Sequence, residues 1–81
     1  MEVIKTYHDE GQLKEEYCKI NNKIEGLYKL YHDNGQLYKI CNYINGKENG
    51  EYKSYYKNGQ LKSICNYHNN ATVYYLHQYK I

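Results

Sequence analysis

The 81-residue sequence contains no proline, arginine, tryptophan or phenylalanine, and it has only three cysteines and one methionine. Without proline, nothing in the chain obliges a strand to break. No apolar run is long enough to span a bilayer and no N-terminal segment resembles a signal peptide, so we expect a cytoplasmic protein, in the host cytoplasm if the source is viral. An odd number of cysteines with no Cys-x-x-Cys pair indicates free thiols in a reducing compartment.

Tyrosine supplies most of the large apolar surface, with 13 residues. Each one carries a hydroxyl that needs water or a partner, which suits half-exposed sheet faces. Lysine, asparagine, isoleucine and tyrosine dominate, and their AT-rich codons predict the genome of a low-GC bacterium or a large DNA virus. The net charge of +2 is unevenly spread, because residues 1–25 hold four lysines and six acids while residues 52–81 hold four lysines and no acid.

The sequence repeats itself every 24 residues. The segment HDEGQLK at 8–14 returns as HDNGQLY at 32–38 and as YKNGQLK at 56–62. A fixed period of this length is typical of stacked supersecondary units. Two strands and two turns fill 24 residues and leave little for a helix. The sequence therefore predicts an all-β protein, a single-layer antiparallel meander of about seven strands built from β-hairpin repeats.

We expect one domain over residues 1–81, with repeats at 2–25, 26–49 and 50–73 and a terminal half repeat at 74–81. Tyr79 lies 24 residues after Tyr55, so residues 72–80 are expected to form the first strand of a fourth repeat. A capping helix that starts after Asn70 is the alternative. The outer strands of such a meander have unpaired edges, which favour a dimer through the terminal strands or through one face.

Two kinds of turn alternate along the chain, a short one at 33–35 and a longer one at 45–50. Asn-Gly between apolar runs is the strongest short-range hairpin signal, in a two-residue type I′ turn or a three-residue loop with a left-handed glycine. We favour the three-residue loop because it places Tyr31 opposite Leu37, an aromatic–aliphatic pair that recurs in every copy. The equivalent pairs are Tyr7 with Leu13 and Tyr55 with Leu61.

With that register, strict alternation sorts the middle repeat into two mixed faces. The first face is expected to hold Leu27, Lys29, Tyr31, Leu37, Lys39, Cys41 and Tyr43, and the second Tyr28, Leu30, His32, Gln36, Tyr38, Ile40, Asn42 and Ile44.

The segments GLYKLYHDNGQL at 26–37 and GEYKSYYKNGQLK at 50–62 resemble the MORN repeat, specifically the variant repeat found in the YwqK-type antitoxin family. The linker NYINGKENG at 42–50 is similar to the segment between hairpins of that repeat, and the likeness covers residues 2–80. The resemblance implies a β-hairpin repeat fold and a scaffold that binds partners or lipids, or an antitoxin.

The cysteines and histidines offer little chemistry in this arrangement. Cys41 and Cys65 occupy equivalent positions in adjacent repeats and are therefore expected to lie two strands apart. Their Cα atoms would be about 9.6 Å apart, which is beyond the ~7 Å limit for a disulfide. Cys18 is displaced by one residue from the equivalent position in the first repeat, so its side chain is expected on the other face. Buried apolar thiols are expected, with an intermolecular bridge as the alternative. His8 and His32 share a column and cannot bind one metal ion without a ligand from a third strand.

No pattern in the sequence is typical of catalysis, and no cofactor motif is present. Ser54 and Ser63 fall inside expected strands rather than in a nucleophile elbow, and there is no glycine-rich phosphate loop. Glu15 and Glu16 are adjacent, so their side chains alternate to opposite faces of a strand and cannot share a proton. We expect a protein that is not an enzyme and binds neither metal nor cofactor.

Rows of like residues are therefore the candidate binding features. Lysines and tyrosines recur on one face, and a second row of tyrosines recurs on the other. The side chains of these rows either hold the repeats together or contact a partner. Three hypotheses follow: a non-catalytic scaffold that binds an unidentified protein and self-associates, an antitoxin-like neutraliser of a toxin, and a binder of single-stranded nucleic acid or anionic membrane. Replacement of Tyr28 and Tyr52 by serine is expected to abolish partner binding without unfolding the protein. The candidate partner-binding residues are Tyr28, Tyr52, Lys29, Lys53, Tyr31 and Tyr55.

Overall fold

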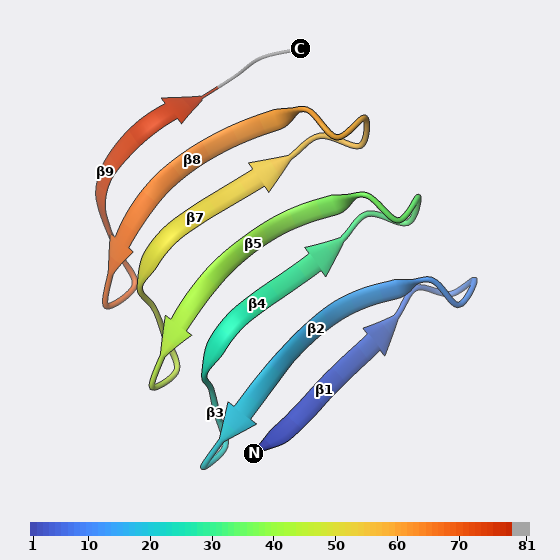
Figure 1. The fold of residues 1–81 in the computed structure, drawn as a ribbon, viewed down its shortest axis with the longest axis horizontal. Helices are drawn as coiled ribbons and strands as arrows, with labels where there is room; N and C mark the ends of the chain where they lie inside the picture. Colours follow the sequence, from blue (N-terminus) through green and yellow to red (C-terminus); the bar gives the residue numbers. More distant parts are fainter. Residues whose placement is uncertain (79–81) are drawn as a thin grey trace.

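The computed structural model describes residues 1–78, with residues 72–78 described by their backbone alone, and this part of the chain contains strands and turns without a helix. The long strands run in the order β1-β2-β4-β5-β7-β8-β9 across one antiparallel sheet (Figure 1). The short strands β3 and β6 pair with β2 and β5. The expected all-β meander is confirmed. The strands are β1 (Glu2–Tyr7), β2 (Leu13–Ile20), β3 (Lys23–Ile24), β4 (Gly26–Tyr31), β5 (Leu37–Ile44), β6 (Lys47–Glu48), β7 (Gly50–Tyr55), β8 (Leu61–His68) and β9 (Ala71–Gln78).

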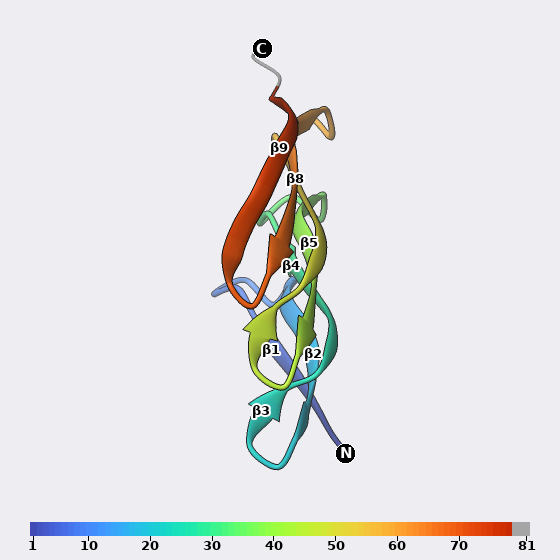
Figure 2. The same ribbon diagram turned by 90° about the vertical axis from the view of Figure 1, so that its left-hand side faces the viewer.

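The sheet forms a single layer. The molecule measures 39 × 36 × 12 Å, and the view along the sheet shows how thin it is (Figure 2). Among residues 1–71, the buried side chains are those of Cys41, Cys65, Ser54 and Ser63. Because no second layer covers either face within the described residues, most side chains are only half-buried.

Each hairpin turn is a three-residue loop closed by two backbone hydrogen bonds. In the middle repeat, the N–H of His32 donates to the carbonyl of Gln36 at 2.8 Å, and the N–H of Gly35 donates to the carbonyl of His32 at 3.0 Å. Gly35 has a φ of 88°, which a residue with a Cβ rarely adopts. The turns at 8–12 and 56–60 have the same bonds, so the predicted three-residue loop is confirmed.

A β-bulge follows each turn. Tyr31 lies opposite Leu37 as predicted, but the next pair is Leu30 with Lys39, so Tyr38 has no partner across the strands. The same pairing leaves Lys14 unpaired in the first repeat and Lys62 in the third.

The bulge makes the predicted division of the faces wrong beyond Leu37. One extra residue moves every later side chain of β5 to the opposite face. Tyr28 consequently lies opposite Cys41 and shares its face, whereas Leu27 lies opposite Asn42. Lys39, Cys41 and Tyr43 therefore join Tyr28 and Leu30 instead of Leu27, Lys29 and Tyr31.

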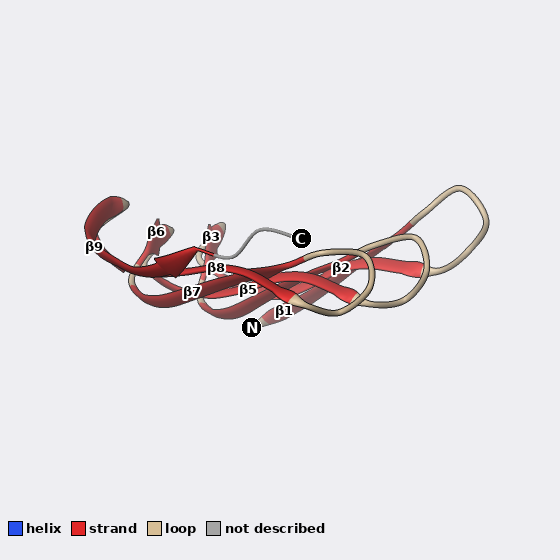
Figure 3. Cartoon of the chain, turned by 90° about the horizontal axis from the view of Figure 1, so that it is seen from above, coloured by secondary structure: helices blue, strands red, loops and turns tan. Residues whose placement is uncertain are grey.

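The longer predicted turn at 45–50 is instead a tight turn followed by a bend in the next strand. Asn45 and Gly46 have φ values of 53° and 83°, as a type I′ turn requires, and Ile44 lies opposite Lys47. The chain then bends at Gly50, where φ is 91° and β6 passes into β7. Figure 3 shows that β3, β6 and the start of β9 rise on the same side of the sheet.

The C-terminal segment forms a strand. Residues 71–78 form β9, which pairs with β8, so the alternative of a helix after Asn70 is wrong for these residues. Tyr79 and the rest of the predicted half repeat lie outside the described residues.

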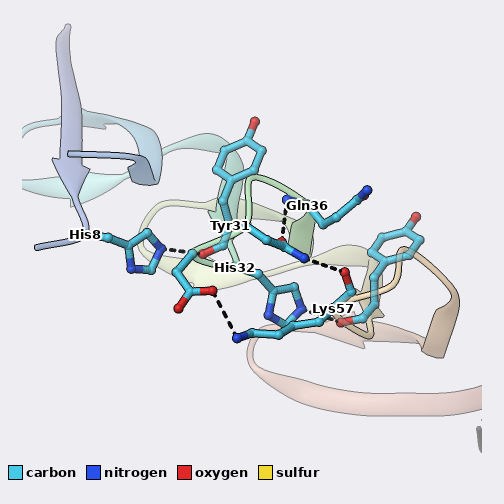
Figure 4. Close-up of polar contacts among 8 residues, drawn as sticks. His8, Tyr31, His32, Gln36 and Lys57 are labelled. Atoms are coloured by element: carbon cyan, nitrogen blue, oxygen red, sulfur yellow. Dashed lines mark hydrogen bonds and ion pairs between the residues drawn. The ribbon is translucent and has the colours of Figure 1, made fainter. Parts of the chain in front are cut away.

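Histidines connect adjacent repeats at the hairpin-turn end of the sheet. The Nε2 atom of His8 donates to the carbonyl of Tyr31 at 2.9 Å, and that of His32 donates to the carbonyl of Tyr55 at 2.9 Å (Figure 4). The ladder between β2 and β4 is short: Glu15 lies opposite Leu30, and Glu16 lies opposite Lys29. The imidazoles therefore supply inter-repeat hydrogen bonds where the strands have separated.

The turn loops add further contacts at this end. The side-chain amide of Asn34 donates to the carbonyl of Lys57 at 2.8 Å, and the Lys57 ammonium lies 3.0 Å from the Asp33 carboxylate (Figure 4).

The opposite end of the sheet is closed by a second set of inter-repeat bonds. The N–H of Gly46 donates to the carbonyl of Ile24 at 3.0 Å, and the N–H of Asn70 donates to the carbonyl of Glu48 at 2.9 Å. The N–H of Asn45 also donates to the carboxylate of Glu25 at 2.7 Å. The second and third tight turns are thus bonded to the short strand of the repeat that precedes each of them.

We predict that His8→Ala lowers the free energy of unfolding by about 1 kcal/mol, because the Tyr31 carbonyl loses its imidazole donor. Urea unfolding followed by circular dichroism measures the change. His68→Ala is the matched control, since His68 is exposed at the end of β8. Equal unfolding midpoints for the two variants would show that the histidine bond contributes nothing.

Candidate binding surfaces

The sheet presents two chemically different faces. We call the first the tyrosine face, because aromatic side chains from β2, β4, β5, β7 and β8 line it. We call the second the aliphatic face, because leucine, isoleucine and valine side chains alternate there with lysines. The tyrosine face carries Tyr17, Tyr28, Tyr43, Tyr52, Tyr67 and Lys39, and the aliphatic face carries Val3, Lys5, Tyr7, Leu27, Lys29, Tyr31, Leu37, Ile40, Lys53 and Tyr55.

The five tyrosines of the tyrosine face form a nearly continuous row. Ring centroids lie 5.3 Å apart for Tyr17 and Tyr28, 5.9 Å for Tyr28 and Tyr43, and 5.6 Å for Tyr52 and Tyr67. Lys39 fills the remaining gap, since its Nζ atom lies 5.4 Å from the Tyr28 ring and 5.6 Å from the Tyr52 ring. Each of these rings is half-buried, so the row is both ordered and accessible.

The tyrosine face is the concave side of the sheet. Glu48 on the bent strand β6 lies opposite Tyr43, and its Oε1 accepts a bond from the Tyr43 hydroxyl at 3.4 Å. Its negative charge also contributes to the raised pKa values of Cys41 and Tyr52, on β5 and β7. The Glu48 carboxylate, bonded to Tyr43 through one oxygen and with its other oxygen buried, thus lies on the tyrosine face. The bent ends in Figure 3 therefore lean over the tyrosine face.

A polar network fixes one end of the row. The Tyr28 hydroxyl donates to Oε2 of Glu15, and the Thr6 hydroxyl donates to Oε1 of the same carboxylate at 2.8 Å. The bond from Tyr28 is the main reason that the pKa of Glu15 is lowered. Burial, followed by this bond to an anion, raises the pKa of Tyr28.

Burial also raises the pKa of other phenol and thiol groups on this face. It raises the pKa of Tyr43 and of Tyr52 to about 12 and that of the Cys41 thiol to about 11. Cys41 and Cys65 are 2% and 1% exposed, so the expected burial of these thiols is confirmed. Cys18 lies on the opposite face beside Val3 and is only half-buried, so the expected burial is wrong for this thiol. All three cysteines are free.

The six predicted partner-binding residues are divided between the two faces. Tyr28 and Tyr52 belong to the tyrosine face, whereas the lysines and the other two tyrosines belong to the aliphatic face. No single flat surface brings all six together, and their contact with a partner stays a prediction. The four on the aliphatic face are Lys29, Lys53, Tyr31 and Tyr55.

The lysine row is partly neutralised by its neighbours. Lys5 lies 3.6 Å from the carboxylate of Glu16, and Lys53 lies 3.4 Å from that of Glu51. These ion pairs reduce the positive potential that a polyanion would need along the row.

Sequence reasoning missed four members of the tyrosine face. Tyr43 and Tyr67 are spaced by 24 residues, which marks them as equivalent, but the unrecognised bulge placed Tyr43 on the wrong face. Lys39 was misplaced for the same reason. Tyr17 has no tyrosine at the equivalent positions, which are Cys41 and Cys65, so the repeat gave no signal for it.

Within the described residues, no cluster of three or more histidine, cysteine or acidic side chains could hold a metal ion. The same part of the chain has no helix long and apolar enough to cross a membrane.

The sequence model of the MORN repeat variant matches residues 3–18, 24–45 and 48–69, which covers all three hairpins described above. The chain belongs to the MORN repeat variant family. No curated protein and no solved structure matches it. Repeats of the MORN family are non-enzymatic modules that bind proteins or membranes, so the family supports a binding role in general terms. The YwqK-type relationship stays a prediction.

We predict that stability falls as the pH rises above about 10, the usual tyrosine pKa in an unfolded chain. Tyr28, Tyr43 and Tyr52 have raised pKa values in the folded protein, so the folded state holds these protons more tightly. Their contribution is complete below pH ~10 and is lost as the pH rises through the folded values. Urea unfolding at a series of pH values and phenolate absorbance measure both effects. An unfolding free energy that stays constant up to pH ~11.5 would contradict the tyrosine environments described here.

Proposed function

We propose that this MORN repeat variant is a non-catalytic scaffold that binds a segment of another protein on its concave tyrosine face. The observation that carries the proposal is the row of five half-exposed tyrosines, bridged by Lys39, on the concave side of the sheet. Tyrosine is enriched at protein interfaces because it contributes a large contact area and orders few torsion angles on binding.

The row is already ordered before a partner arrives. The Tyr28 hydroxyl is held by Glu15, and its ring contacts those of Tyr17 and Tyr43. An ordered surface loses little side-chain entropy when it binds, which raises affinity for a given contact area.

The charges of the tyrosine face favour a protein over a polyanion. Glu15 and Lys39 lie close enough that the lysine charge lowers the pKa of the carboxyl. A partner with both signs of charge, as protein segments have, can match this pair. On the aliphatic face, the ion pairs of Lys5 and Lys53 also weaken the case for nucleic acid or anionic membrane. A toxin enzyme is one partner of the proposed kind, and neutralisation would follow if the bound segment bordered its active site.

We predict that Tyr52→Ser weakens partner binding at least about tenfold, since truncation of a central interface tyrosine removes one to two kcal/mol or more. Tyr55→Ser is the matched control, because Tyr55 lies on the same strand and is also half-buried but points to the aliphatic face. The measurement is affinity capture from an extract of producing cells with mass spectrometry, followed by titration of the captured protein.

Both variants are first compared by urea unfolding, so that a loss of fold is not mistaken for a loss of contact. If Tyr55→Ser weakened binding and Tyr52→Ser did not, the partner would bind the aliphatic face and the proposal would be wrong. Binding of single-stranded RNA that weakens steeply with salt would instead support a polyanion ligand.

A further inference from the structure

Exposed aliphatic side chains concentrate on the aliphatic face of the first two repeats. Val3 is 60% exposed, Leu27 56%, Ile20 44% and Ile44 51%. The third repeat has Glu51 at the position of Val3 and Leu27, and His68 at that of Ile20 and Ile44. Large exposed apolar patches on soluble proteins often mark interaction sites.

Two shallow grooves flank Leu27 on this face. One is lined by Val3 and Cys18, with Leu27 at its border, and the other by Leu37 and Ile40 with Leu27 again at the border. Because Leu27 belongs to both linings, it forms a ridge between the two grooves.

We propose that the aliphatic face of repeats one and two docks a second copy of this chain about a twofold axis, with each Leu27 placed in a groove of the other copy. This interface lies on the opposite side of the sheet from the tyrosine face and is independent of the partner proposed for that face. A twofold interface joins the same patch on both subunits, so the patch must be self-complementary. A ridge at Leu27 that lies between two grooves gives the patch both a projecting part and a receiving part, as that requirement demands.

The charges around the ridge also fit a second copy. Glu16, Glu25 and Lys29 line the first groove, and Glu51 and Lys53 line the second. Each groove thus carries both signs, and Lys53 and Glu51 already lie 3.4 Å apart. Because both signs are present, a twofold axis can place lysines of one copy against carboxylates of the other, whereas a membrane or a nucleic acid would require an excess of positive charge that these grooves lack.

The dimensions of the sheet allow such a dimer. The sheet extends 39 by 36 Å, which exceeds the roughly 800 Å² per partner that a stable interface buries. Its thickness of 12 Å corresponds to one layer, and stable β domains bury the apolar face of a sheet against a second layer. A second copy would supply that layer.

The repeats themselves supply the test, because the residue at position 27 in the second repeat is leucine and at the equivalent position 51 it is glutamate. Sedimentation equilibrium and light scattering over a concentration series give the dimer dissociation constant. We expect Leu27→Glu to raise it at least about tenfold, because a charge replaces an apolar contact at the centre of the interface. Glu51→Leu extends the apolar patch into the third repeat and is expected to lower it.

Gln60→Glu adds one charge in an exposed turn and is expected to leave the dissociation constant unchanged. Circular dichroism and urea unfolding establish that each variant is folded, and Ile44→Glu replaces Leu27→Glu if the latter unfolds. A wild-type protein that is monomeric throughout the series overturns the proposal. So does a dimer that Leu27→Glu and Ile44→Glu leave intact, since its interface would lie elsewhere. Neither result bears on capture of a partner by the tyrosine face.

Discussion

The unpaired residue that follows each hairpin turn determines which side chains share a face, and the binding surfaces depend on it. Lys14, Tyr38 and Lys62 occupy these bulges. Because side chains alternate along a strand, one extra residue moves the rest of the second strand to the other face. Without the bulge, Tyr43 would lie beside lysines of the aliphatic face and the tyrosine row would be interrupted. The bulge thus separates an aromatic concave face from an aliphatic one in a chain whose sequence shows two mixed faces.

Polar contacts at the two ends of the strands hold successive repeats together. The imidazoles of His8 and His32 bond the next repeat at the hairpin-turn end, and the turns near Asn45 and Asn70 bond the preceding repeat at the other end. Between these ends the repeats are joined by short ladders, as at Glu15 and Leu30. Solenoid-like folds of this kind depend on contacts between neighbouring repeats. Since many of these contacts lie at the ends, side chains in the middle of each face are available for binding.

The sequence was sufficient to predict the parts of the structure that have local causes. The period of 24 residues and the glycine at the end of each turn predicted hairpins, their three-residue loops and the Tyr31–Leu37 pair. Tyr28 and Lys29 were correctly assigned to opposite faces because they are neighbours on one strand. The bulge was not predicted, since the unpaired positions hold lysine or tyrosine rather than glycine or proline. The concave shape depends on strand bends near Gly26 and Gly50, whose effect on the sheet is a tertiary property.

The three repeats have the same backbone fold but carry different side chains on the tyrosine face. The two ends of this face are therefore chemically different. Equivalent positions on the floor of the tyrosine face hold Glu15, Lys39 and Ser63 in successive repeats. The first repeat places a carboxylate there, bonded to Tyr28, while the third has a neutral pair of hydroxyls, Ser54 and Ser63, with oxygens 2.6 Å apart. A segment lying across the strands therefore meets an anion, then a cation, then neutral hydroxyls. Reversal of that segment would place its own charges against like charges, which costs binding energy even when the aromatic contacts are unchanged. The repeated backbone thus supplies a regular aromatic surface, and the differences between repeats would favour one orientation of a segment bound to it.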